Sequence, residues 1–466
     1  MRLPLPRSRA SLLVLLAGLS GAAAAELPRQ DLLTADGSTL EAARGTWANA
    51  ENGWLLEIGP KGLKRWQDTP AGCYASRQDG PTTMAQIEYR YFTAVDADTA
   101  RFEYLPSDGH AVFRRLPALP AHCGRDDLSG PREVFEVFRG VFERHYAFFD
   151  RRGVDWRSLA DAAGRRIGPQ TSEAALWDAL AGMIRPLGDS HTKLIGTVDG
   201  EPRREQAGLG STLPMIRAGM GEPAWLQALV AQTRQRLDGG GHHVGNERVI
   251  WGSLDGRVGY VQFFTMGGFG TEHAPGTPEW AEAEIAATHA LLDEALAAFE
   301  GQEAVVLDLS NNRGGYDAVT RAIVSHFIDA PRDLYTVRND WDAPPAATYR
   351  VTPWAGRRFT GPVYVLTSDV TVSGGEITTL MLRQLPNVMH VGGTTRGAFS
   401  TPLAKPLPNG WYVELSNEIF ADMQGEVFEG RGIPPAWPLT VFDPADPVAS
   451  HARVLDAILD HTRQSH

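Results

Sequence analysis

The sequence predicts an α/β core preceded by a β-rich region and a helical segment. Between residues 26 and about 125, short aromatic and β-branched runs are broken by Gly, Asn and Asp, which is typical of strands and turns. Residues 131–187 instead carry apolar side chains at helical spacing. From about residue 257 onward, strand-like runs alternate with helix-like runs. Such alternation indicates parallel strands joined by helices.

The composition limits the possible partners. The chain has 466 residues, enough for two or three domains and a sizeable core. Its formal net charge is −12 at pH 7, and it contains only four lysines. This balance argues against nucleic acid and against an anionic membrane surface as partners.

Residues 1–25 have the features of a secretory signal. Three arginines precede an apolar stretch at 10–21, which is too short to span a bilayer, and the alanines at 22–25 offer a cleavage site. We therefore expect export across the inner membrane to the periplasm. We find no later apolar run long enough for a membrane span.

Residues 26–125 are expected to form a β-rich accessory domain without a catalytic constellation. It contains Cys73 and the chain's only other cysteine, Cys123. Two cysteines in an exported protein suggest one disulfide, and two buried thiols are the alternative.

Residues 126–200 are expected to be helical. Pro131 suits the first turn of a helix, and the apolar residues that follow it repeat on one face. Two further helices are predicted at 154–164 and 172–187, and the second leads into the sequence GDSHTKL.

Residues 201–446 are expected to form the α/β core, followed by a C-terminal helix at 447–466. The sequence GGGHHVG at 239–245 is interpreted as a loop. Its adjacent histidines, His242 and His243, lack partners at ligand spacing, so we expect no metal site there.

The core contains three strands that are followed by turns and helices. We predict strands at 257–264, 304–309 and 362–367, and helices at 278–300 and 317–328. A further strand is expected at 387–393.

The turn TVSGGE, which follows the strand at 362–367, contains the candidate nucleophile Ser373. It lies where a strand gives way to a helix, and unpaired N–H groups at a helix N-terminus favour negative charge. A serine there can attack a carbonyl whose oxyanion is held by those N–H groups. The alternative is that Ser373 only caps the helix.

Other motifs supply possible partners for Ser373. Gly314 and Gly315 end the turn SNNRGG, His191 lies in GDSHTKL, and Glu429 lies in FEGRGIPP. Each motif alone is weak evidence.

Together, and in this order, the motifs resemble those of the carboxyl-terminal processing (tail-specific) peptidases and the tricorn protease core. The resemblance covers about residues 131–440 and rests on GDSHTKL, GRVGYVQFF, DLSNNRGG, TVSGGE, VGGTTRG and EGRGIPP. It implies a crotonase/ClpP-like spiral core, serine peptidase activity without a cofactor or metal, and peptide or unfolded-protein substrates. It leaves the oligomeric state open.

The departures from the family pattern favour the tricorn-like subtype. Relatives with a Ser–Lys dyad carry a lysine where this chain has Ala398, and the later Lys405 does not match that motif. The tricorn-like pattern instead implies Ser373 as nucleophile and His191 as base. It adds Ser190 and Glu429 as supporting members.

The resemblance also implies an oxyanion hole formed by the N–H of Gly374 and a glycine N–H of the 314–315 pair. Ser310 replaces the usual arginine of that turn, and Ala436 replaces an aspartate after Pro435. Glu376 fits the family pattern, although a role as a first-turn helix charge would also explain it. No PDZ-like segment is evident.

The sequence leaves three alternatives. A non-catalytic peptide- or ligand-binding relative on the same fold is disfavoured because all four candidate catalytic residues are present. SHTK at 190–193 matches the S-x-x-K signature of penicillin-binding proteins, but its partner motifs are missing. A metallopeptidase is disfavoured because H-E-x-x-H does not occur.

Overall fold

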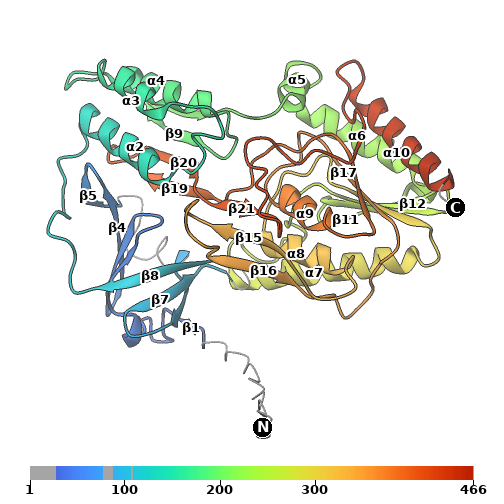
Figure 1. Ribbon diagram of the computed structural model, residues 1–466, viewed down its shortest axis with the longest axis horizontal. Coiled ribbons are helices and arrows are strands. Elements are labelled where there is room, and N and C mark those ends of the chain that lie inside the picture. The colour runs from blue at the N-terminus through green and yellow to red at the C-terminus, as the bar shows by residue number, and fades with distance from the viewer. Residues whose placement is uncertain (1–27, 77–87, 106–108, 465–466) are drawn as a thin grey trace, which may run out of the picture.

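The computed structural model describes residues 28–76, 88–105 and 109–464. The signal-like segment at 1–25 therefore lies outside the described residues. In Figure 1 the chain passes from an N-terminal sheet, through a group of helices, into a large α/β region that includes the C-terminal helix. None of the helices in the described ranges has the length and apolar character that a membrane crossing requires.

The N-terminal region is one antiparallel sheet of eight strands. Its core is aromatic, and Trp47, Phe92 and Phe102 meet edge to face with ring centroids 5.4–6.0 Å apart. A short 3₁₀ helix, η1 (Glu41–Ala43), precedes β2. In spatial order the strands are β1 (Gln30–Asp31), β6 (Tyr91–Ala94), β7 (Thr99–Glu103), β8 (His110–Leu116), β2 (Gly45–Asn49), β3 (Trp54–Gly59), β4 (Gly62–Thr69) and β5 (Gly72–Ala75).

The structure forms the disulfide that the sequence predicts. It joins Cys73, on the edge strand β5, to Cys123, in the segment that follows β8. The bond ties the sheet edge to the chain that leads into the helices.

The helical segment consists of α2 (Pro131–His145), α3 (Trp156–Gly164), α4 (Glu173–Ile184) and the short η2 (Arg185–Leu187). The apolar face of α2 is fully buried, as its spacing predicts. Side chains of Asp155 and Ser172 accept N–H bonds at the starts of α3 and α4. These helices lead directly into the GDSHTKL motif.

The α/β core is built on a seven-stranded sheet, whose strands from β13 to β22 are parallel. In spatial order the strands are β11 (His242–Val244), β12 (Val249–Leu254), β13 (Val258–Phe263), β14 (Ala304–Asp308), β17 (Val363–Thr367), β18 (Val388–Gly392) and β22 (Trp437–Pro438).

Helices cover both faces of this sheet, so its central strands are apolar on both sides. One core cluster joins residues of the sheet to α7 (Pro278–Ala298), α8 (Asp317–Ser325) and α9 (Gly374–Leu382). The other cluster joins the sheet to α5 (Thr212–Ala218), α6 (Glu222–Arg236) and α10 (Pro447–Gln464). Alternate residues of β14 enter the two clusters, Val305 the first and Val306 the second.

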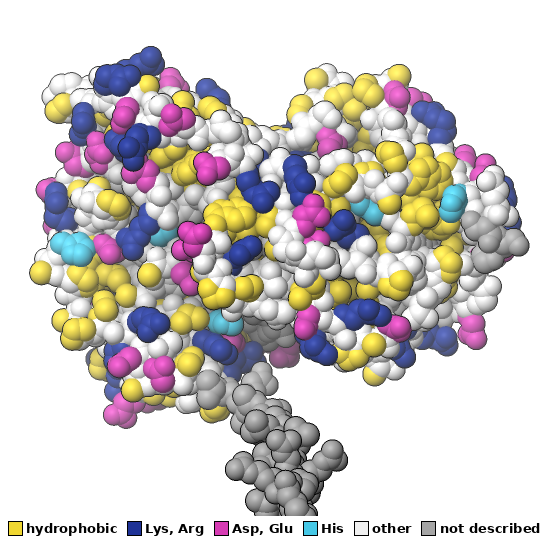
Figure 2. All heavy atoms as spheres, viewed as in Figure 1, with side chains coloured by type: hydrophobic (Ala, Val, Ile, Leu, Met, Phe, Trp, Pro, Cys, Tyr) yellow, Lys and Arg dark blue, Asp and Glu magenta, His cyan; other side chains and the backbone are white. Residues whose placement is uncertain are grey.

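Two small antiparallel sheets connect the helical segment to the core. The first has the order β10 (Glu201–Gln206), β9 (Lys193–Val198), β20 (Tyr412–Ser416) and β19 (Pro402–Pro406), and the second the order β16 (Ala347–Val351), β15 (Arg332–Arg338) and β21 (Ile419–Ala421). Because β9 pairs with β20, the GDSHTKL motif is held against the C-terminal third of the chain. Figure 2 shows two lobes separated at the top of the view by a notch, with α3 and α4 on one side and α5 on the other.

The prediction that residues 239–245 form only a loop was wrong. After the short η3 (Asp238–Gly240), His242–Val244 form the edge strand β11, which pairs with β12. The His242 ring stacks on Trp251 with a centroid distance of 3.9 Å. His243 Nε2 contacts the carbonyl of Glu247. This pairing with β12 was not visible in a Gly-rich sequence.

Candidate active site

Ser373 lies between β17 and α9, in a conformation that is rare for any residue except glycine. Its φ is 57° and its ψ is −121°. The backbone is held from both sides, because its N–H donates to Ala398 O at 3.0 Å and its carbonyl accepts from Glu376 N at 2.8 Å. Its side chain makes no capping hydrogen bond to α9. The alternative that Ser373 is simply an N-cap is therefore wrong.

The glycine turn lies directly against Ser373. A Cβ atom placed on Gly314 would lie 2.6 Å from the Cβ of Ser373, and one placed on Gly374 would lie 3.3 Å from Gly315 N. The N–H of Gly314 is already used, because it donates to Asn312 Oδ1 at 2.9 Å. Within the described residues we find no acceptor for the N–H groups of Gly315 and Gly374. These two are therefore the candidate oxyanion donors.

His191 lies in a buried turn that Asp189 organises. The Asp189 carboxylate accepts hydrogen bonds from His191 N at 2.9 Å, Thr192 Oγ1 at 2.9 Å and Tyr146 OH at 3.1 Å. Burial lowers the pKa of His191 below its usual value of 6.5, while the Asp189 carboxylate and the backbone of Ser400 oppose this shift.

Two atoms beside this turn are buried and unsatisfied. Among the described residues, neither His191 Nδ1 nor Ser190 Oγ has a hydrogen-bond partner. Buried polar atoms normally have hydrogen-bond partners. The lack of partners at these two atoms therefore requires a functional explanation.

Glu429 is buried and fully engaged, but not with Ser190. Its Oε1 accepts from Arg152 Nη2 at 3.0 Å. Its Oε2 accepts from the N–H groups of Phe399 and Ser400 at 2.8 and 3.2 Å. Burial raises the pKa of Glu429 to about 8, the nearby Asp189 adds to the shift, and Arg152 opposes it.

One short segment, residues 397–400, links the candidate residues. Ser373 N–H binds the carbonyl of Ala398, Glu429 binds the N–H groups of Phe399 and Ser400, and the ring of His191 interacts with the backbone of Ser400. The structure thus brings Ser373, His191 and Glu429 to the same segment. It does not join them by direct hydrogen bonds.

Glu376 also contacts this segment, which goes beyond the role of a helix-end charge. Its carboxylate accepts from Gly397 N at 2.6 Å and Ala398 N at 2.8 Å. Burial raises the pKa of Glu376 to about 7, against the lowering effects of Thr395 and the two N–H groups. The carboxylate therefore holds Ala398, the same residue whose carbonyl accepts the N–H of Ser373.

Arg152 is a residue of the site that sequence reasoning missed. Its side chain is only 7% exposed, and it contacts Glu429, the carbonyl of Gly188 at 2.8 Å and the carbonyl of Gly397 at 3.2 Å. Its Nη2 also lies 3.6 Å from Asp189 Oδ1. In the sequence, Arg152 stands in the unremarkable run DRRGVDW, and no local signal marks it.

Lys405 lies away from Ser373. Its Nζ contacts the carbonyl of Asn52 and lies 3.9 Å over the ring of Trp54, so it faces the N-terminal sheet. Ala398 occupies the position where dyad relatives carry their lysine.

Ser310 and Ala436, which depart from the family pattern, both still form hydrogen bonds through their backbone groups. Ser310 N–H donates to Asp308 Oδ1 at 2.8 Å, and its carbonyl accepts from Ser368 Oγ. Ala436 N–H donates to the carbonyl of His390 at 2.9 Å.

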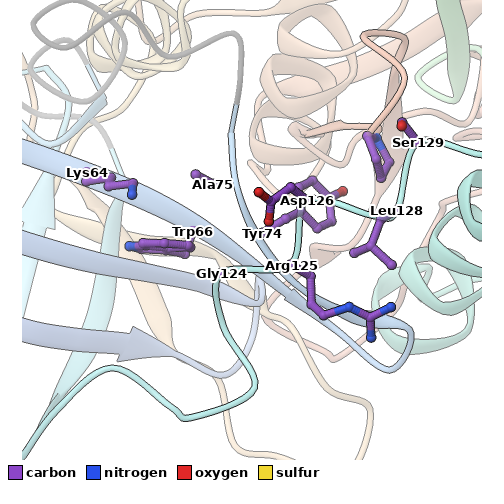
Figure 3. Close-up of a pocket in the computed structure, with 10 residues that line it drawn as sticks. Lys64, Trp66, Tyr74, Ala75, Gly124, Arg125, Asp126, Leu128 and Ser129 are labelled. Atoms are coloured by element: carbon purple, nitrogen blue, oxygen red, sulfur yellow. The ribbon is translucent and has the colours of Figure 1, made fainter.

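Two other features are separate from this site. A cavity of about 280 Å³ between the N-terminal sheet and the segment after Cys123 is lined by Lys64, Trp66 and Arg125 (Figure 3). Among the described residues, Cys73, His122 and Cys123 form the one cluster with metal-ligand geometry, but the disulfide uses both sulfurs.

Comparison with protein families identifies the core. Residues 257–438, which include Ser373, Gly314 and Gly315, match the family model described as peptidase family S41. The chain carries an S41 serine peptidase domain. Between β9 and β12, the chain forms β10, α5, α6, η3 and β11.

Solved structures share the fold of this S41 peptidase. A peptidase from Parabacteroides merdae has a TM-score of 0.55 and 21% identity, over 72% of this chain and 97% of that chain. The mature form of CPAF, in complex with lactacystin, has a TM-score of 0.51 and 13% identity, over 71% of this chain and 97% of that chain. At these identities the likeness concerns the fold.

Proposed function

We propose that this S41 peptidase hydrolyses peptide bonds through an acyl-enzyme at Ser373, with His191 as the base. The observation that carries the proposal is the strained Ser373, whose side chain is released from capping and faces the glycine turn. Strain of this kind persists only where the surroundings enforce it, and it recurs at active sites.

The reaction follows from these groups. Ser373 Oγ attacks the substrate carbonyl carbon while His191 accepts the hydroxyl proton, and the N–H groups of Gly315 and Gly374 stabilise the oxyanion. His191 then returns the proton to the leaving amine as the C–N bond breaks. Water, deprotonated by the same histidine, attacks the Ser373 ester, and the acid product leaves as His191 returns the proton to Ser373 Oγ.

Ser190 and Glu429 are proposed as supporting members. The unsatisfied Ser190 Oγ and His191 Nδ1 belong to adjacent residues, so rotation of the hydroxyl would give the ring nitrogen an acceptor and fix its tautomer. Glu429, with Arg152 and the 399–400 N–H groups, would hold the segment against which the histidine packs.

The same proposal includes a crotonase/ClpP-like fold of the core and a periplasmic location of the protein. The parallel strands β13, β14, β17 and β18, flanked by helices, support a crotonase/ClpP-like spiral core. The disulfide and the signal-like segment at 1–25 support export to the periplasm. Peptides or unfolded proteins are the proposed substrates, and no cofactor is required.

Covalent labelling tests this proposal. A fluorophosphonate probe should label the wild-type protein at one site, and Ser373→Ala should abolish both labelling and peptide hydrolysis. Ser211→Ala is the matched control, because Ser211 is also a serine at the start of a helix and is exposed. Labelling that survives Ser373→Ala would contradict the proposal, and no labelling of the wild type would favour a non-catalytic binding relative.

A further inference from the structure

A groove of about 870 Å³ runs along α6, between this helix and the β11–β12 hairpin. One wall carries Leu226, Val230 and Arg234 from a single face of α6, and the other includes Leu237, Arg248 and Phe264. We call it the α6 groove. Figure 1 labels α6 and β11, which both contribute lining residues.

Only part of the apolar lining is accessible. Leu237 and Phe264 are buried in the core cluster on this side of the sheet and Val230 packs against it, whereas Leu226 is exposed. Trp225, Leu229 and Thr233 bury one face of α6 against the sheet. Leu226 lies on a different face and is 41% exposed, which makes it one of the few large apolar side chains at the surface. An exposed apolar side chain on a concave wall with an apolar base is typical of a binding surface.

The groove also carries uncompensated positive charge. Arg234 and Arg248 line it, and neither forms an ion pair with a described residue. Arg234 Nε donates to the carbonyl of Gly240, which holds the side chain in the groove and leaves its terminal nitrogens for a ligand. Glu247 is the one acidic lining residue, so the arginines outnumber it. The charge is complementary to a carboxylate.

One end of the groove is tied to the proposed oxyanion turn. Arg313, which precedes Gly314, donates its N–H to the carbonyl of Phe264 at 2.9 Å. The Arg313 side chain binds Glu222, the first residue of α6, at 3.0 Å. A peptide leaving Ser373 past this turn would therefore meet the start of the groove.

We propose that the α6 groove binds an extended segment of the substrate, beyond the scissile bond, that carries apolar and acidic side chains. This inference rests on the proposed function. Residues 223–235 of α6 span about 18 Å at 1.5 Å per residue, which matches about five residues of an extended peptide. Apolar side chains pack on Leu226 and Val230, and a carboxylate binds Arg234 and Arg248.

A binding experiment tests the inference without requiring catalysis. The disulfide uses both native cysteines, so a cysteine introduced at position 226 provides a single thiol for a photo-crosslinker. In a Ser373→Ala background, Leu226→Cys should cross-link a decapeptide of alternating Leu and Glu at least tenfold more than Ala224→Cys. Ala224 is exposed on the same helix but does not line the groove.

Two further arms make the test specific. A Leu/Lys decapeptide should cross-link at least fivefold less than the Leu/Glu peptide, and Arg234→Glu should remove that preference. Equal cross-linking at positions 226 and 224 would overturn the proposal. So would cross-links between two copies of the chain that the peptide does not displace, because the groove would then be an interface between copies.

Hydrolysis supplies an independent measurement. Leu226→Glu should lower the ratio of kcat/KM for the Leu/Glu decapeptide to that for a four-residue substrate at least fivefold, through KM. Ala224→Glu should leave this ratio unchanged. Peptide binding without hydrolysis in the wild type would contradict only the proposed function, whereas hydrolysis without dependence on the groove would contradict only this inference.

Discussion

At the scale of single residues, the site depends on side chains that are buried at a cost and held by the backbone around them. His191, Glu429 and Glu376 are all buried, and each contacts the short segment 397–400. Burial disfavours their charged forms, and it shifts their pKa values in the directions that favour neutral imidazole and neutral carboxyl groups.

The pH dependence of activity follows from His191. Burial lowers its pKa below 6.5, so the neutral form that accepts the Ser373 proton is already dominant at pH 7. We expect kcat/KM to stay level near neutrality and to fall about tenfold per pH unit below that pKa. A profile of kcat/KM from pH 4.5 to 8 checks this, and an acid limb centred above pH 7 would contradict it.

Arg152 gives a second prediction at this scale. Arg152→Met removes the guanidinium that lies against both Asp189 and Glu429, and breaking a buried charge pair typically costs about 3–5 kcal/mol. We expect a lower free energy of unfolding, measured by urea denaturation, together with a large loss of kcat. Arg157→Met, at an exposed arginine nearby, is the control. Full activity in Arg152→Met would show that the site does not depend on the contacts of Arg152.

At the scale of elements, the pattern of apolar residues in the sequence predicted most of the helices and strands that depend on local sequence. The strands expected at 304–309 and 362–367 appear as Ala304–Asp308 and Val363–Thr367, and the C-terminal helix appears as Pro447–Gln464. Continuous apolar runs, and the residues typical of helix and strand ends, locate these elements to within a few residues. The edge strand β11 was missed because its glycine-rich sequence has no strand periodicity, and only pairing with β12 orders it.

The disulfide gives a prediction for the N-terminal sheet. Cys73 and Cys123 are 50 residues apart, and closing such a loop stabilises the folded state by about 4 kcal/mol in the entropic model. The double variant Cys73→Ser, Cys123→Ser should lower the free energy of unfolding by up to that amount, measured by urea denaturation. Dithiothreitol should destabilise the wild type and leave the variant unchanged. Two alkylatable thiols in the unreduced, denatured wild type would contradict the assignment.

At the scale of the whole molecule, the candidate site is assembled from segments that are far apart in sequence. Arg152 and Glu429 are separated by 277 positions, yet they form one buried pair. Ser373, His191 and the glycine turn could be predicted from the sequence because they lie in recognisable motifs. Arg152 could not be predicted, because a long-range contact leaves no local pattern in the sequence.

Lys405 shows how the N-terminal sheet is connected to the core. It is fully buried, and it comes from β19, next to the site-bearing segment, but it reaches Asn52 and Trp54 of the sheet. Burial, reinforced by Arg65 and Arg144, lowers its pKa well below 10.5. A lysine with a depressed pKa resembles a catalytic base, but the position of this one assigns it to packing between the two regions.

The central claim is that a histidine, and not a lysine, activates Ser373. The most direct test is kcat/KM for His191→Ala and Lys405→Met, measured side by side on the same peptide with folding checked by circular dichroism. Methionine keeps most of the buried length of the lysine, so the packing of β19 against the sheet is largely preserved. We expect His191→Ala to lose at least a thousandfold, because nucleophile and base act as a unit, and Lys405→Met to stay within a few fold of the wild type. An inactive, folded Lys405→Met beside an active His191→Ala would contradict the account and point to a displaced Ser–Lys dyad.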